Sequence, residues 1–217
     1  AQQLHFLNAN SALVSIENPE SKELAYTGIE WAPEVTLSQQ GTTVVASHPS
    51  GEIVAITFRP DVEVSLKANN YCAVAPARDS DCVMISFFDN ADTMTSRLSD
   101  IEKTLADPAD ALAANSSRWE GYLNSTLRPD MPDDYDRIAV KAITTLVANH
   151  RAPRGGLLHD GIIPSHAAWY FVGLWAWDSW RFSAGVASFD PELAKNNIRA
   201  MFDYQRPDGM IIDCIYT

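Results

Sequence analysis

The sequence predicts an α+β protein whose N-terminal part is an antiparallel β-sandwich and whose C-terminal part is helical. Two observations support this prediction. Up to about residue 90, segments that are rich in β-branched residues or alternate between apolar and polar residues are separated by turn-forming clusters. From Asp89 onward, apolar residues recur instead at the three- and four-residue spacing of helices. Because no helical pattern interrupts the regularly spaced strand-like segments, an antiparallel sandwich is favoured.

Four strands are predicted most clearly within residues 1–90. They cover residues 42–47, 52–58, 62–68 and 82–88, with the turn clusters HPSG, RPD and ARDSD between them. The chain begins within strand-like residues and shows no obvious start of a domain. This pattern would fit a sheet whose first strands are absent.

Residues 91–130 are predicted to form a helical linker between two domains. A first helical pattern ends near Pro108, because proline interrupts a helix, and a second ends before the turn RPDMPDD at residues 128–134. The apolar positions of the two patterns are Met94, Leu98, Ile101 and Leu105, then Leu112, Trp119, Tyr122 and Leu123.

Residues 131–217 are predicted to be helical with long loops. The first helix should have Asp133 or Asp134 as its N-cap, and the last, over residues 190–205, should begin with Asp190 as N-cap and Pro191 at its first position. The apolar faces comprise Tyr135, Ile138, Ala139, Ala142, Ile143, Leu146 and Val147, then Leu193, Ala194, Asn197, Ile198, Met201 and Phe202. Three helices are too few to enclose a core around such long loops. We therefore expect a truncated chain or one piece of a larger polypeptide.

Composition argues against some classes of partner. The 217 residues carry a formal net charge of −12, which argues against nucleic acid and anionic membranes. No apolar run approaches the roughly 20 residues that span a bilayer. The N-terminus, AQQLHFLNAN, lacks the features of a signal peptide, although a signal removed before Ala1 would leave no trace. The compartment stays open, with a periplasmic or secreted location slightly favoured over the cytoplasm.

The three cysteines carry little information. Cys72, Cys82 and Cys214 form an odd set without CxxC spacing, so neither a disulfide framework nor a zinc site is expected. Cys72 and Cys82 could pair across neighbouring strands, but free buried thiols are favoured.

The stretch 173-GLWAWDSWRFSAG-185 is the most informative, because three of the six tryptophans surround Asp178. In one interpretation, Asp178 is the N-cap of a helix over residues 179–187 and the tryptophans fill a core. In the other, the stretch forms a sugar subsite. An indole stacks on the apolar face of a pyranose, and a carboxylate at a helix N-terminus stays ionised and accepts hydrogen bonds from sugar hydroxyls.

Longer stretches are similar to the bacterial glucosidases of glycoside hydrolase family 63, and related motifs occur in trehalases and mannosylglycerate hydrolases. The stretches are 118-RWEGYLNSTL-127, 139-AVKAITTLVANHRAPRGG-156, WAWDSW and 189-FDPELAKNNIRAMFDYQ-205. The most distinctive spacing is W-x-W-D-[ST]-W followed by F-[DN]-P-x-x-A-x-x-x-I-R-A. The resemblance implies an N-terminal β-sandwich, a helical linker and an (α/α)6 barrel. Residues 1–90 would be a portion of the sandwich, 91–130 the linker, and 131–217 the start of an incomplete barrel.

The resemblance also implies that this chain supplies part of a substrate subsite and neither catalytic group. Trp177 is expected to wall the pocket of the non-reducing glucose, and Asp178 to accept hydrogen bonds from its hydroxyls. Trp175 and Asp213 are further substrate-binding candidates, whereas Trp180, one turn into the helix, is expected in the core. The acid and base of inverting hydrolysis come from later barrel segments, beyond residue 217, so the chain alone should be inactive.

Other polar residues near these segments have simpler explanations. Asp208 and Gly209 are expected to form only a turn. Arg151 and Arg154 could line the site, but interaction with the C-terminus of the preceding helix is favoured.

No metal site or cofactor is predicted in this chain. His159, Asp160 and His166 have metal-binding side chains, but their spacing fits no common ligand pattern. The resemblance allows a calcium ion elsewhere in the complete protein.

Three functions are therefore distinguished. The first is a glycosidase that acts on terminal α-linked glucose of an oligosaccharide with inversion, completed by the rest of the enzyme, which could be a second polypeptide. The second is a non-catalytic carbohydrate-binding module that stacks sugar on Trp175 and Trp177. The third is a structural domain with the tryptophans in its core, which no sugar would stabilise. A module should fold alone, whereas a barrel fragment should need its missing helices.

Overall fold

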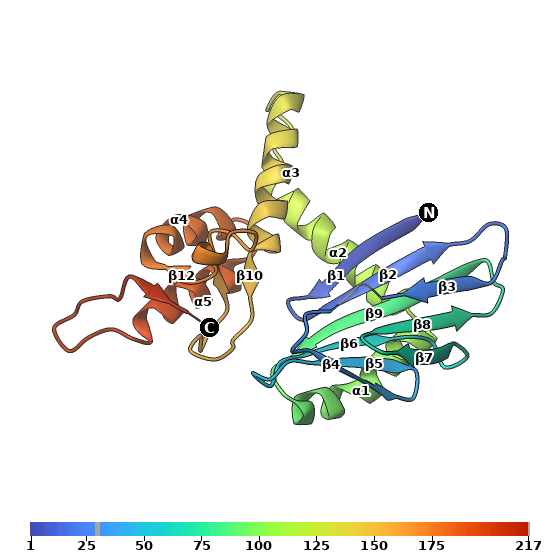
Figure 1. Ribbon diagram of the computed structural model, residues 1–217. Helices are drawn as coiled ribbons and strands as arrows, with labels where there is room; N and C mark the ends of the chain where they lie inside the picture. Colours follow the sequence, from blue (N-terminus) through green and yellow to red (C-terminus); the bar gives the residue numbers. More distant parts are fainter. Residues whose placement is uncertain (29–30, 217) are drawn as a thin grey trace. The chain divides into compact units, whose positions relative to one another are not determined.

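The computed structural model describes residues 1–28 and 31–216, apart from the side chains of Asp133 and Trp169. The chain divides into two compact units, Ala1–Asn115 and Ser116–Thr217. The described part of the first unit contains two antiparallel sheets, one helix and the start of a second, and the second unit is mainly helical (Figure 1). The predicted α+β class is thereby confirmed.

The larger sheet of the first unit has six strands in the order β1-β2-β9-β6-β5-β4, and every neighbouring pair is antiparallel. The smaller sheet has the order β3-β8-β7 and is also antiparallel. The four strands predicted from sequence are confirmed as β5, β6, β7 and β9. The bounds are β1 Gln2–Asn8, β2 Ser11–Glu17, β3 Leu24–Thr27, β4 Thr36–Gln40, β5 Thr43–Ser47, β6 Ile53–Thr57, β7 Glu63–Lys67, β8 Asn70–Ala75 and β9 Ser80–Phe88.

The central strands of the larger sheet are buried on both faces. Successive side chains of a strand point to opposite faces, and in β5 the neighbours Val44 and Val45 belong to two different hydrophobic clusters. One cluster includes Tyr71 and residues of the smaller sheet, so the two sheets share a core. The other includes Met94 and Leu105 of α1 (Ala91–Ala106), which contacts β6 and β9 (Figure 1). Double burial explains why these strands are nearly continuous apolar runs.

The ends of α1 are set by local chemistry. The Asn90 side chain accepts a hydrogen bond from the Thr93 N–H, as an N-cap residue does. The helix ends at Ala106, and α2 (Ala109–Thr126) begins just after Pro108. Proline interrupts the helical pattern where the sequence predicted. The boundary between the two units, Asn115/Ser116, falls within α2.

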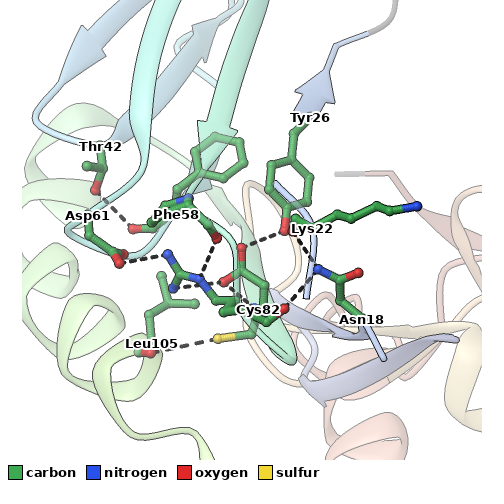
Figure 2. Close-up of polar contacts among 11 residues, drawn as sticks. Asn18, Lys22, Tyr26, Thr42, Phe58, Asp61, Cys82 and Leu105 are labelled. Atoms are coloured by element: carbon green, nitrogen blue, oxygen red, sulfur yellow. Dashed lines mark hydrogen bonds and ion pairs between the residues drawn. The ribbon is translucent and has the colours of Figure 1, made fainter. Parts of the chain in front are cut away.

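A buried acid, Asp81, joins the two sheets of the first unit, and its hydrogen-bond partners Tyr26 and Cys82 are labelled in Figure 2. The Asp81 side chain, at the start of β9, is only 1% exposed. Its Oδ2 accepts a 2.6 Å hydrogen bond from the Tyr26 hydroxyl on β3, and its Oδ1 accepts one from the Cys82 N–H at 2.9 Å. Arg78 lies between this carboxylate, at 3.6 Å, and that of Asp61, at 2.7 Å. Each Asp81 oxygen therefore has a partner, which a buried charge requires.

The same contact predicts an alkaline limit to stability. Burial, and then the neighbouring Asp81 carboxylate, raise the pKa of the Tyr26 phenol well above its ordinary value of 10.0. An unfolded tyrosine loses its proton near that value while the folded one keeps it, so stability is intact below about pH 10 and decreases above it. Urea unfolding at about pH 8 and about pH 11 should show this loss, and a smaller loss in Tyr26→Phe. Equal losses in both proteins would contradict the prediction.

In the described residues, the second unit contains the end of α2, three further α-helices, the short 3₁₀ helix η1 and two small antiparallel ladders. Among the described residues the ladders are β10–β11 and β12–β13. One hydrophobic cluster includes Ile143, Val186 and Leu193, and another includes Leu174 and Met201. The bounds are α3 Asp133–Ala148, β10 His150–Arg151, β11 Gly161–Ile162, η1 Trp169–Phe171, β12 Leu174–Trp175, α4 Ala176–Val186, α5 Pro191–Phe202 and β13 Cys214–Ile215.

Helix starts in this unit follow the predictions in part. Asp190 caps α5 by accepting a hydrogen bond from the Leu193 N–H, and Pro191 opens the helix as expected. The predicted N-cap of α3 was wrong, because Pro132 occupies that position without a side-chain hydrogen bond. The Asp133 side chain lies outside the described residues. Asp134 lies in the first turn, where a carboxylate interacts favourably with the helix dipole.

Candidate functional site

The candidate sugar-binding residues gather where α4 begins, because β13 pairs with the short strand just before the helix. Leu174 lies opposite Ile215, and Trp175 lies opposite Cys214. The Ala176 N–H, in the first turn of α4, donates a 2.9 Å hydrogen bond to the Asp213 carbonyl. The structure therefore brings Asp213 beside the WAWDSW stretch, although nearly forty residues separate them in the chain.

This pairing depends on a glycine at position 173. A Cβ atom there would lie closer to the Cys214 Sγ than non-bonded atoms approach, and 3.1 Å from the Ile215 carbonyl oxygen. The carbonyl belongs to the backbone and cannot move aside as a flexible side chain would. Close contact between the two segments therefore requires the absence of a side chain.

We expect Gly173→Ala to displace β13 from β12 and to lower the free energy of unfolding of the second unit by about 1–3 kcal/mol. The matched control is Gly121→Ala in α2, where an added Cβ would meet nothing within 4 Å. The control should be neutral or slightly stabilising, because alanine favours helix more than glycine does. Hydrogen exchange of the Ala176 amide measures the displacement, and wild-type protection in Gly173→Ala would contradict it.

Trp177 and Asp178 occupy the first turn of α4. Trp177 is 72% exposed, and the Arg181 guanidinium lies 5.5 Å from its ring centroid. The helix begins at Ala176 with Trp175 as N-cap, so Asp178 stands inside the helix at the third position, half-buried. The prediction that Asp178 caps a helix starting at residue 179 was therefore wrong. Its carboxylate still lies within the first turn, at the positive end of the helix dipole.

Trp180 is not a core residue, contrary to the prediction. It is 39% exposed and packs edge-on against Phe202, which is itself 49% exposed. The buried residues of α4 are instead Ser179, Ser183 and Val186. Small side chains on this face allow α4 to pack closely against α5, and the bulky indoles are left on the other faces. The alternative in which the tryptophans fill a core is therefore wrong for Trp177 and Trp180.

Trp175 is less exposed than Trp177 and Trp180. It is half-buried, and its ring packs edge-on against Phe171 at 6.2 Å and Tyr216 at 6.4 Å between centroids. Its Nε1 is buried, and the described residues supply no hydrogen-bond acceptor for it. The Trp175 carbonyl accepts a 2.7 Å hydrogen bond from the Ser179 hydroxyl, which fixes the backbone at the start of α4.

The three residues with metal-binding side chains lie in different contacts. His159 Nδ1 lies 2.8 Å from an oxygen of Asp203. Asp160 faces His150 at 2.8 Å and accepts a hydrogen bond from Asn196, while His166 pairs with Asn149. Within residues 1–28 and 31–216, no three His, Cys, Asp or Glu side chains are grouped to hold a metal ion.

The remaining polar candidates have structural roles. Asp208 lies in the predicted turn, where its carboxylate accepts a hydrogen bond from the Met210 N–H. Arg151 and Arg154 follow the end of α3, whose C-cap is Asn149 and whose last turn contains no basic residue. Arg151 lies in β10, and burial lowers the pKa of its guanidinium.

The cysteines are free, as predicted. Cys72 lies in β8 of the smaller sheet and Cys82 in β9 of the larger one, so the alternative of a pair across neighbouring strands is excluded. Only Cys82 is fully buried, and burial raises the pKa of its thiol.

Two residues important for this region were not singled out in the sequence. Gly173 was simply part of the tryptophan stretch, and its role depends on a contact with residues 214–215. Asn197 was counted on the apolar face of the last helix, but it is an amide that is fully buried. A polar residue in the middle of an otherwise apolar face was the available signal for Asn197.

The comparison with protein-family models gives no match to this chain. Among the helices within the described residues, none combines the length and the apolar composition needed to span a membrane.

Proposed function

We propose that this chain is part of a glycoside hydrolase of the family 63 type, which releases terminal α-linked glucose from an oligosaccharide with inversion. Trp177 and Asp178 line the subsite that holds the glucose, with Trp175 and Asp213 beside them. The general acid and base belong to the rest of the enzyme, carried on the same or on a second polypeptide. This chain alone binds sugar without hydrolysing it.

The observation that carries the proposal is a solvent-facing indole next to a carboxylate at the start of a helix. Trp177 is 72% exposed, and Asp178 follows it in the first turn of α4. Tryptophan is highly buried on average, and exposed indoles are enriched where proteins contact ligands or partners. The flat ring suits the C–H face of a pyranose, and the carboxylate suits two neighbouring hydroxyls. Arg181, over the same ring, limits the face that remains for sugar.

The proposal extends to the fold. The two sheets of the first unit would correspond to a portion of the N-terminal β-sandwich, α1 and α2 to the helical linker, and α3 to α5 to the first helices of an (α/α)6 barrel. The shared core between the two sheets supports the sandwich. The barrel rests on the sequence resemblance and on the three helices that follow the linker.

Titration of the chain with methyl α-D-glucopyranoside, followed by tryptophan fluorescence, tests the sugar site. We expect saturable binding that Trp177→Ala abolishes. Ile138→Ala is the control, since Ile138 is an equally exposed apolar residue, at 67%, on α3. Absence of binding in the wild-type chain would overturn the proposal.

A second assay distinguishes the hydrolase from the carbohydrate-binding module. The module is the second candidate because the Trp177 ring is 72% exposed and accessible for stacking on a sugar. Native mass spectrometry of the protein as prepared shows whether a second polypeptide is bound, and glucose release is then measured on the complete assembly. Release with inverted anomeric configuration supports the hydrolase. Binding without release by the complete assembly would favour the module.

A further inference from the structure

In α4, small and polar side chains are buried and large aromatic side chains are exposed, which is the opposite of an ordinary surface helix. Ser179, Ser183 and Val186 are buried, whereas Trp177 is 72% exposed and Trp180 39% exposed. Burying an indole gains far more free energy than burying a serine. Apolar burial alone would therefore favour a helix rotated about its axis, with its tryptophans inward. Some other interaction must fix the observed rotation.

The buried amide of Asn197, on α5, provides such an interaction. Its Oδ1 accepts a 2.8 Å hydrogen bond from the Ile162 N–H of β11. Its Nδ2 donates to the Ser179 carbonyl at 2.9 Å and to the Ser183 hydroxyl at 2.8 Å, both on α4. Both amide hydrogens are thus used, and the side chain is fully buried. Rotation of α4 would leave a buried donor without a partner, which is costly.

We propose that Asn197 is a positioning residue that sets the rotation of α4 and thereby keeps Trp177 exposed, with Asp178 next to it in the first turn. Single buried polar residues fix helix register in coiled coils for the same physical reason. The contacts continue from Ser179, whose hydroxyl holds the Trp175 carbonyl at 2.7 Å. The orientation of α4 follows from these contacts alone, whereas its consequence for sugar binding rests on the proposed function.

The most selective variant is Asn197→Asp. A carboxylate at this position still accepts from the Ile162 N–H, and the Ser183 hydroxyl can turn to donate to it. The oxygen that replaces Nδ2, however, faces the Ser179 carbonyl oxygen and repels it. The control is Asp190→Ala, which removes the hydrogen bonds that the Asp190 carboxylate accepts from the Leu193 N–H at the start of α5 and from the Tyr122 hydroxyl on α2. This control destabilises the same helix without altering a contact to α4.

The experiment uses the 217-residue chain labelled with 5-fluorotryptophan, with Trp177 and Trp180 assigned from Trp177→Phe and Trp180→Phe. Fluorine chemical shifts and their solvent isotope effects are recorded without sugar and then during titration with methyl α-D-glucopyranoside. In Asn197→Asp we expect both resonances to move, their solvent isotope effects to fall, and the sugar affinity to drop about tenfold or more. Asp190→Ala should retain wild-type resonances and affinity.

A folded Asn197→Asp protein with wild-type shifts and isotope effects at Trp177 and Trp180 would overturn the inference. If this variant does not fold, Ser183→Ala, which removes one acceptor of the Asn197 amide, replaces it with the same expected direction. If the wild-type chain does not bind the glucoside, the proposed function fails. The comparison without sugar still decides the role of Asn197.

Discussion

Replacing Asp81 with alanine should lower the free energy of unfolding of the first unit by about 3–5 kcal/mol, which is the usual cost of removing one partner of a buried ion pair. The substitution leaves the Tyr26 hydroxyl without its acceptor and Arg78 without its buried counter-ion. It also removes the hydrogen bond that links β3 of the smaller sheet to β9 of the larger one. Hydrogen exchange of β2 and β9 amides during urea titration measures the loss.

Asp61→Ala is the matched control for this prediction. Asp61 also pairs with Arg78, at 2.7 Å, but its side chain is 55% exposed, against 1% for that of Asp81. An exposed ion pair typically contributes about 0–1 kcal/mol, so the control should change stability little. Equal losses in the two variants would show that the contact with Arg78, and not burial of the acid, determines the effect.

Asp178→Ala should weaken the binding of methyl α-D-glucopyranoside by roughly tenfold to a hundredfold or more, because each hydrogen bond to a charged group contributes about 1.5–3 kcal/mol. In the complete enzyme, kcat/KM should fall by a similar factor. The variant should keep nearly normal thermal stability. Asp178 is half-buried in the first turn of α4, where interaction with the helix dipole is worth about 0.3–1 kcal/mol. Calorimetric titration and thermal unfolding measure the two effects.

Asp208→Ala provides the control with the same change in net charge. Asp208 lies in the exposed turn after α5, where it accepts a hydrogen bond from the Met210 N–H. Sugar affinity should stay at the wild-type level in this variant. Unchanged sugar affinity in a folded Asp178→Ala protein would show that Asp178 does not contact the sugar. The proposed pairing of Trp177 and Asp178 in one subsite would then be wrong.

Much of the fold could be predicted because the predictive signals are local. In β5, Val44 and Val45 contribute to opposite cores. Their β-branched run before a turn cluster indicated a strand. In α5, the Asp-Pro pair at residues 190–191 indicated the first turn, because an acceptor side chain and a fixed φ angle suit a helix start. Short strands were harder to identify: β12 and β13 have two residues each and exist through pairing alone.

The candidate site was predictable by residue type and less so by geometry. Trp177 and Asp178 were selected because an indole and a carboxylate together suit a sugar. The position of Asp178 inside the helix and the exposure of Trp180 were predicted wrongly. The first error concerns where α4 begins, and the second concerns which way α4 faces. The second depends on Asn197, which lies on another helix.

The sequence by itself determined the α+β order, the positions of the main helices and of strands β5, β6, β7 and β9, and the chemical character of the WAWDSW stretch. These follow from repeats of side-chain direction, every two residues in a strand and about every 3.6 in a helix. Tertiary structure alone decided that Asp213 meets the start of α4, where the Ala176 N–H binds its carbonyl, and that the tryptophans of α4 face outward. Both depend on contacts between distant segments. The buried amide of Asn197 must keep its hydrogen bonds to α4, and Gly173 must leave room for β13.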